Sequence, residues 1–186
     1  MLLYLHGFGS SPDSHKARRT AAAAAARGLA FACPQLPVSP SAAGALAEDI
    51  IASGGERVTL IGSSLGGHYA TWLAERHDCR AVLVNPAVVA ALDLDRFVGR
   101  HPWWGRDEYF EFTAAHAAEL RALDVAAITR PERYWLLAEE GDEVLDYRHA
   151  VAKYAGARQT VLPGGDHSFS RWDAMLDAVL DFATAS

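Results

Sequence analysis

The sequence has few cysteines, no cluster of basic residues and no long apolar run. Its 186 residues include only two cysteines, Cys33 and Cys79, and neither has the neighbours of a metal site or of a disulfide framework. The 17 basic and 23 acidic side chains give a net charge of −6, with none of the basic runs that bind a nucleic-acid backbone. No apolar stretch reaches the roughly 18 residues needed to cross a bilayer. We therefore expect a cytoplasmic protein with reduced thiols and no nucleic-acid or membrane partner.

Short apolar runs alternate along the chain with longer segments of helical periodicity. The expected strands are residues 2–5, 30–33, 58–61, 81–84, 134–137 and 160–162, and the expected helices are 14–27, 42–53, 65–76, 146–154 and 172–184. Several strands are apolar at every position, which is typical of strands buried on both faces of a parallel sheet. The pattern predicts one α/β domain over residues 1–186. Six mostly parallel strands would lie between helices in the spatial order 2-1-3-4-5-6.

The sequence GSSLG at residues 62–66 follows an apolar strand and opens a helical segment. A G-x-S-x-G pattern at a strand-to-helix turn is typical of a nucleophilic serine, because the strained turn exposes the hydroxyl. Ser64 occupies the serine position, since Ser63 would need a glycine in place of Ile61. The alternative is a serine that only caps the helix. His68, four residues further along the same helix, is expected to line the site.

A second glycine-rich turn, HGFGSS at residues 6–11, follows the first strand. It does not continue as a dinucleotide-binding turn, because Pro12 stands at the third glycine position and no acidic residue ends the second strand. In a serine hydrolase this turn offers a backbone N–H, here that of Phe8, which together with the N–H of Leu65 forms the oxyanion hole. His6 would brace the turn. No metal or organic cofactor is expected.

A serine hydroxyl is too weakly acidic to react unaided, so it needs a base and a carboxylate that orients the base. GDEV at residues 141–144 follows the fifth strand and GGDH at 164–167 follows the sixth. The resulting chain order Ser64, Asp142, His167 is that of α/β-hydrolases. The carboxylates that compete with Asp142 for this place are Glu139, Glu140, Glu143 and Asp146.

Several segments together resemble the small bacterial YqiA/YcfP esterases of the α/β-hydrolase superfamily. They are residues 3–8, 33–37, 62–67, 84–87, 141–148, 158–161 and 164–169. The resemblance covers nearly the whole chain and is weakest between residues 92 and 131. It implies a minimal α/β-hydrolase fold that begins at the strand before the oxyanion turn. It also implies a catalytic triad of Ser64, Asp142 and His167.

One connection, residues 86–133, is far longer than the dozen or so residues that a crossover between strands needs. It holds six of the chain's 18 aromatic residues within sixteen positions: Phe97, Trp103, Trp104, Tyr109, Phe110 and Phe112. So many exposed rings would form an apolar patch, so we expect residues 93–124, the cap segment, to fold over Ser64. Trp103 and Trp104 would then line the acyl pocket. The alternative is that the rings only pack the insertion onto the sheet and its helices.

These residues predict a serine esterase or thioesterase for a small acyl substrate, in which Ser64 attacks the carbonyl and His167 accepts the serine proton. Two other functions stay open at this point. The same triad could transfer the acyl group to an alcohol or amine instead of water. A protein of this fold could also bind a small ligand without turnover. The sequence predicts no oligomeric state.

Overall fold

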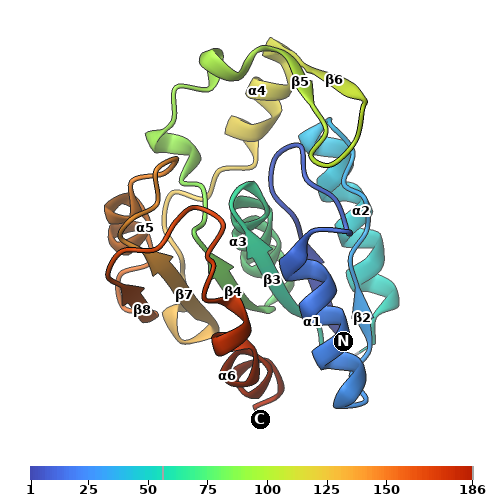
Figure 1. Cartoon of the computed structure of the whole chain (residues 1–186), viewed down its shortest axis with the longest axis vertical. Helices are drawn as coiled ribbons and strands as arrows, with labels where there is room; N and C mark the ends of the chain where they lie inside the picture. Colours follow the sequence, from blue (N-terminus) through green and yellow to red (C-terminus); the bar gives the residue numbers. More distant parts are fainter. Residues whose placement is uncertain (56, 186) are drawn as a thin grey trace.

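The computed structural model describes residues 1–55 and 57–185. The strands of the main sheet are β1 (Leu2–Leu5), β2 (Phe31–Ala32), β3 (Thr59–Ser63), β4 (Arg80–Val84), β7 (Tyr134–Glu139) and β8 (Arg158–Leu162). The helices are α1 (His15–Ala26), α2 (Pro40–Ser53), α3 (Leu65–His77), α4 (Ala114–Ala122), α5 (Tyr147–Lys153) and α6 (Trp172–Thr184). The sheet is parallel throughout, in the order β2-β1-β3-β4-β7-β8 (Figure 1). The predicted fold class and strand order are confirmed.

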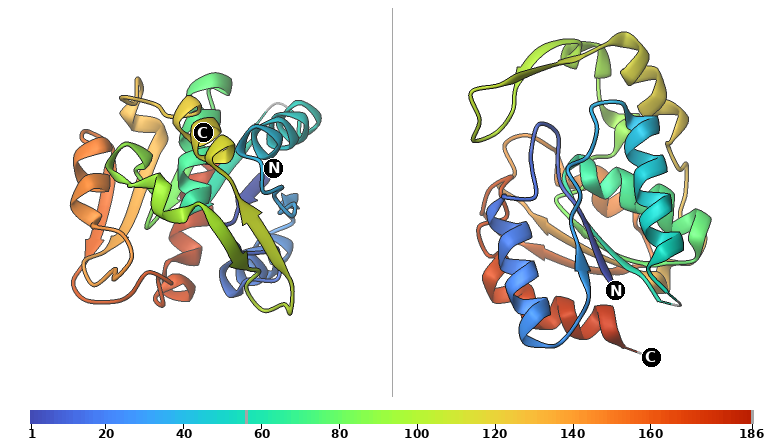
Figure 2. Two further views of the ribbon diagram at one scale, coloured as in Figure 1. Left: turned by 90° about the horizontal axis from the view of Figure 1, so that it is seen from above. Right: turned by 90° about the vertical axis from the view of Figure 1, so that its right-hand side faces the viewer.

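The sheet separates two apolar layers. Leu3 and Leu5 of β1 pack with side chains of α2, α3 and α5, whereas Tyr4 between them packs with side chains of α1 and α6. Figure 2 shows these helix groups on opposite sides of the sheet. Because both faces are covered, every residue of β1, β3 and β7 is buried. This explains the uninterrupted apolar runs in the sequence.

Several element boundaries differ from the sequence prediction by one or two residues, and two of these differences have identifiable reasons. Helix α2 begins at Pro40 instead of residue 42, because Ser39 caps it by accepting a hydrogen bond from the N–H of Ala42 at 3.2 Å. Strand β3 continues to Ser63 instead of ending at residue 61, because its last two residues pair with β4. The sheet therefore extends to the residue directly before Ser64.

The long insertion contains secondary structure that the sequence did not predict. It forms an antiparallel hairpin of β5 (Gly99–Pro102) and β6 (Tyr109–Phe112), then α4, preceded by the short 3-10 helices η1 (Val89–Ala91) and η2 (Leu94–Phe97). A third 3-10 helix, η3 (Pro131–Arg133), leads into β7. In Figure 1 the hairpin and α4 lie at the top of the molecule, above the end of the sheet from which β4 leads into the insertion.

Both cysteines are free thiols, and Cys79 is buried. Within residues 1–55 and 57–185, no helix is both long and apolar enough to cross a membrane. The same residues contain no group of three or more histidine, cysteine or acidic side chains that could hold a metal ion.

Candidate active site

Ser64 lies at the sharp turn between β3 and α3 and has a strained backbone, with φ 55° and ψ −122°. Its backbone is held in place by three hydrogen bonds. Its N–H donates to the carbonyl of Val84 at 3.0 Å, and its carbonyl accepts from the N–H groups of Ala87 at 3.0 Å and Gly67 at 2.9 Å. The residue two positions after Ser64 must be a glycine, because a Cβ on Gly66 would collide with the carbonyl of Leu5. The turn therefore has the backbone that the G-x-S-x-G pattern predicts.

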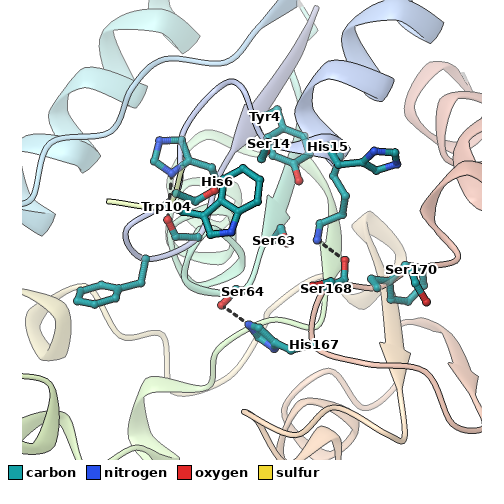
Figure 3. Close-up of a pocket in the computed structure, with 15 residues that line it drawn as sticks. Tyr4, His6, Ser14, His15, Ser63, Ser64, Trp104, His167, Ser168 and Ser170 are labelled. Carbon is teal, nitrogen blue, oxygen red and sulfur yellow. Dashed lines mark hydrogen bonds between the residues drawn. The ribbon is translucent and has the colours of Figure 1, made fainter. Parts of the chain in front are cut away.

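The side chains of Ser64, His167 and Asp142 form a continuous chain of hydrogen bonds. Nε2 of His167 lies 3.0 Å from Oγ of Ser64, as Figure 3 shows. Nδ1 of the same ring lies 2.9 and 2.8 Å from the two carboxylate oxygens of Asp142. With Nδ1–H donating to Asp142, Nε2 is free to accept the hydroxyl proton of Ser64. The geometry brings together the three residues that the sequence singled out.

The carboxylate of Asp142 is buried and held ionised. Burial raises its pKa, but hydrogen bonds from His167 and from the N–H groups of Leu145 and Val144 bring the pKa below its ordinary value. The competing carboxylates have other partners. Oδ1 of Asp146 caps α5 by accepting from the N–H of Arg148 at 3.0 Å. Glu139, Glu140 and Glu143 bond to the N–H of Asp166, the hydroxyl of Tyr147 and the N–H of His167, respectively.

The N–H groups of Phe8 and Leu65 have no hydrogen-bond acceptor within the described part of the chain. The turn that carries Phe8 passes close over Ser64, since a Cβ on Gly7 would lie 3.1 Å from that of Ser64. His6 braces the turn. Its Nδ1–H donates to the carbonyl of Gly7 at 3.0 Å, and its Nε2 accepts from the N–H of Leu36 at 3.1 Å. Burial lowers the pKa of His6, in keeping with this neutral tautomer.

Asn85 is a buried residue at the site to which sequence reasoning assigned no role. Its amide nitrogen donates to the carbonyls of Asp166 and His167 at 3.0 and 3.1 Å, and its side-chain oxygen accepts from the N–H of Glu139 at 2.9 Å. It therefore ties the His167 loop to the end of β7. Its φ of 40° suits asparagine, which tolerates the left-handed region. An Asn-Pro pair directly after a strand was the available sequence signal.

Ser64 lies between two cavities of different character. One, of about 260 Å³, is lined almost entirely by apolar side chains. The cap segment contributes Leu94, Phe97, Phe112 and Leu120 to it. The other, here called the polar cavity, has a volume of about 350 Å³ and lies between the oxyanion turn (residues 6–11), the start of α1 and the His167 loop. Its lining combines Lys16 and several serine hydroxyls with the aromatic side chains of Tyr4, Phe8, Trp104 and Phe169. Phe8, Ser64 and His167 border both cavities.

The structure places the three expected pocket residues in three different surroundings. Trp104 is 64% exposed and borders the polar cavity. Its backbone N–H donates to the carbonyl of Gly9 at 2.7 Å and holds the hairpin turn there. Trp103 packs on Phe110 and lines a smaller cavity. His68 is 2% exposed and faces α4, where Nε2–H donates to the carbonyl of Leu120 at 3.1 Å. None of the three lines the apolar cavity beside Ser64.

The ring of Phe8 is the centre of an aromatic cluster that attaches the insertion to the oxyanion turn. Its centroid lies 5.0 to 6.0 Å from those of four rings, all in edge-to-face orientation: Phe97, His101, Phe110 and Phe112. Most aromatic residues of the insertion therefore pack inward. Phe97 and Phe112 also contribute to the wall of the apolar cavity.

Residues 1–184 match the uncharacterised protein family UPF0227. The fold is similar to that of a provisionally named hydrolase from Agrobacterium vitis S4, with a TM-score of 0.80 and 21% identity over 98% of this chain and 87% of that one. Est1E from Butyrivibrio proteoclasticus, with ferulic acid bound, is similar with a TM-score of 0.75 and 14% identity over 97% of this chain and 86% of that one. The mouse alpha/beta hydrolase domain-containing protein 10 is similar with a TM-score of 0.72 and 17% identity over 97% of this chain and 89% of that one. At these identities the likeness shows that the chain has the α/β-hydrolase fold.

Proposed function

Because this chain belongs to UPF0227, the YqiA/YcfP family that its sequence motifs predict, we propose that it hydrolyses carboxylic esters or thioesters through an acyl-enzyme on Ser64. The observation that carries the proposal is the hydrogen-bonded chain Ser64, His167, Asp142 at a strained strand-to-helix turn. The ferulic acid bound to Est1E is a carboxylic acid, which supports the same class of substrate.

In the proposed reaction, Oγ of Ser64 attacks the substrate carbonyl while Nε2 of His167 takes the hydroxyl proton. The N–H groups of Phe8 and Leu65 receive the negative charge that develops on the carbonyl oxygen. Asp142 keeps the imidazole in the tautomer with its proton on Nδ1 and stabilises the imidazolium that forms. His167 then protonates the leaving group, and water activated by the same ring releases the acid.

A fluorophosphonate probe followed by peptide mass mapping tests this assignment. We expect the label on Ser64 alone, because among residues 1–55 and 57–185 it is the hydroxyl that has a base within hydrogen-bond distance in a strained turn. Ser64→Ala should lose turnover by several orders of magnitude, since removing a nucleophilic serine typically costs about 10⁶ in kcat. Ser63→Ala, one residue away, is the matched control and should keep the label. A label on Ser63 or Ser168 would overturn the proposal.

A burst assay with a chromogenic acetate ester separates esterase, transferase and binding protein. An esterase gives an initial burst and then steady release of acetate. Steady formation of an acetylated alcohol in place of acetate, when an alcohol is added, would identify a transferase. Binding of the ester without any release would identify a binding protein.

A further inference from the structure

The polar cavity contains an unusual charged residue. The chain has only two lysines, Lys16 and Lys153, and Lys153 pairs with Asp124 at 2.9 Å. Lys16, in the first turn of α1, lines the polar cavity together with Ser64 and His167. A single half-buried ammonium group thus faces the same cavity as the proposed nucleophile.

The ammonium of Lys16 has unused hydrogen-bonding capacity. One of its N–H groups donates to the carbonyl of Ser168, and no carboxylate of the described residues lies within salt-bridge distance of it. Burial lowers the pKa of Lys16 to about 8, while the more distant carboxylates of Asp166, Glu139 and Asp142 limit this shift. The group is therefore mostly charged at neutral pH.

Several hydroxyl groups line the same cavity as this charge, together with aromatic side chains. Ser10, Ser14, Ser168 and Ser170 all line the polar cavity, and the Ser14 side chain makes no capping bond to α1. Figure 3 shows Ser14 and Ser168 on opposite sides of the hollow, with Ser64 and His167 at one end. One ammonium among hydroxyls is the donor set that suits a compact anion.

We propose that the polar cavity binds a carboxylate on the leaving group of the substrate through Lys16, so that the preferred substrates are apolar acyl esters of hydroxy acids or thioesters of mercapto acids. This inference rests on the proposed function and names its substrate class. The apolar cavity on the other side of Ser64 takes the acyl chain. A carboxylate fits better than a phosphate dianion, because the cavity supplies one cation and lies near three carboxylates.

The two steps of the reaction determine which part of the substrate, the acyl chain or the leaving group, lies in which cavity. Water must reach the acyl-enzyme from the side that the leaving group has vacated. The polar cavity offers serine hydroxyls and the Lys16 ammonium as hydrogen-bond partners for water, whereas the lining of the apolar cavity offers few such groups. Ser64 Oγ bonds to the carbonyl carbon, the bond to the hydroxy-acid oxygen breaks, and the proton held by His167 passes to that oxygen. Water then hydrolyses the acyl-enzyme to the free acid.

The test compares two esters of the same shape, O-butyryl glycolate and O-butyryl glycolamide, which carry a carboxylate and a neutral amide on the leaving group. We expect kcat/KM at pH 7 to favour the glycolate by about 10- to 100-fold, the effect of one charge-assisted hydrogen bond. Lys16→Met should bring this ratio close to 1, and Lys16→Arg should restore part of it. Arg18→Met removes the same charge from an exposed position of α1 and should keep the wild-type ratio.

Three outcomes would overturn the inference. A wild-type ratio near 1 would mean that the cavity does not recognise the carboxylate. An equal loss on both esters in Lys16→Met would show that Lys16 only holds the Ser168 carbonyl in place. A Lys16-dependent preference for monobutyl succinate over butyl succinamate would place the anion on the acyl side. Failure to hydrolyse any ester, with no labelling of Ser64, would instead count against the proposed function.

Discussion

Asp142 and Asp146 lie four positions apart and have different partners, so their variants should differ in kind. Asp142 bonds to Nδ1 of His167, and Asp142→Asn should reduce kcat about 10³- to 10⁴-fold with the fold intact, because the imidazole is then held in the wrong tautomer. Asp146 caps α5, and Asp146→Ala should cost about 1 kcal/mol of stability with little change in kcat. Esterase kinetics and denaturant unfolding of both variants provide the measurement. The reverse pattern would identify Asp146 as the catalytic acid.

Asn85 acts on the chemistry only through the loop that carries His167, which makes its effect separable from substrate binding. Asn85→Asp keeps the shape and tolerates the positive φ, but it places a carboxylate oxygen against two backbone carbonyls. We expect kcat to fall about 10- to 100-fold while KM for a neutral ester stays within about twofold, because the base moves and the cavities do not. A rise in KM with unchanged kcat would argue against a positioning role.

At the scale of elements, the cap segment contributes two aromatic residues, Phe97 and Phe112, to the apolar cavity, and Phe97 can be tested against a neighbour that does not line this cavity. Phe97 in η2 lines this cavity, whereas Trp103 packs on Phe110. Phe97→Ala should therefore shift the preference toward longer acyl esters by about 1 to 3 kcal/mol in relative kcat/KM. Trp103→Ala should lower thermal stability without changing that preference. A chain-length series of acyl esters measures both.

The outcome for the tryptophans would decide between the two interpretations that the sequence left open for the insertion. If Trp103→Ala changes the chain-length preference and Phe97→Ala does not, the acyl chain lies in the smaller cavity that Trp103 borders. Trp104→Ala is the third member of the series. Its exposed ring borders the polar cavity, so its loss should leave the chain-length preference unchanged.

The sheet and the elements around it could be predicted from the sequence, because each local signal there agrees with the global fold. Runs such as Leu2–Leu5 are apolar throughout, and α6 was predicted with both of its bounds. The insertion itself was predicted, but its secondary structure could not be, because the hairpin is short and its alternation covers only four residues. Buried Phe110 and Phe112 alternate with exposed Tyr109 and Glu111, a pattern too short to distinguish from chance.

The positions of individual side chains within the site were less predictable than its backbone. Ser64, Asp142 and His167 follow strands, and parallel strands bring their carboxyl ends to one edge of the sheet. His68 follows Ser64 by about one helical turn, but its ring faces α4, an element that the sequence did not reveal. The contact between Lys16 and Ser168 joins segments 152 residues apart, which spacing in the sequence cannot indicate.

At the scale of the whole molecule, the two candidate cavities are built from segments that meet only in the folded chain. The start of α1, the oxyanion turn, the His167 loop and the cap segment all border Ser64. The hairpin is attached to the oxyanion turn by the Phe8 cluster and by the bond from Trp104 to Gly9. Phe112 packs on the Phe8 ring and also lines the apolar cavity, so its loss should affect both that cavity and the proposed oxyanion donor at Phe8.

The stability of the whole molecule should fall as the pH decreases below neutrality, whereas opposing contributions meet on the alkaline side. His68 is buried, and burial, with Lys153 nearby, lowers its pKa from 6.5 to about 4. Between these two values the unfolded chain binds a proton that the folded chain does not, so the free energy of unfolding decreases as the pH falls from about 6.5 to 4. On the alkaline side, burial raises the pKa of Cys33 from 9.0 to about 12, so the contribution of this thiol is lost as the pH rises above about 9. Lys16, whose pKa burial lowers from 10.5 to about 8, opposes this loss between these two values.

His68→Gln isolates the acid side of this dependence. Gln can keep a donor to the carbonyl of Leu120 but does not titrate, so the variant should lose less stability between pH 7.5 and 4.5 than the wild type. The full contribution of His68 corresponds to about 3 kcal/mol from the difference between its two pKa values, and most of it falls in this interval. Urea unfolding at both pH values measures the difference, with the variant compared to itself so that its own packing cost cancels. An acid loss as large in His68→Gln as in the wild type would mean that His6 and the carboxylate of Asp142, whose pKa values are also lowered in the fold, cause the acid sensitivity instead.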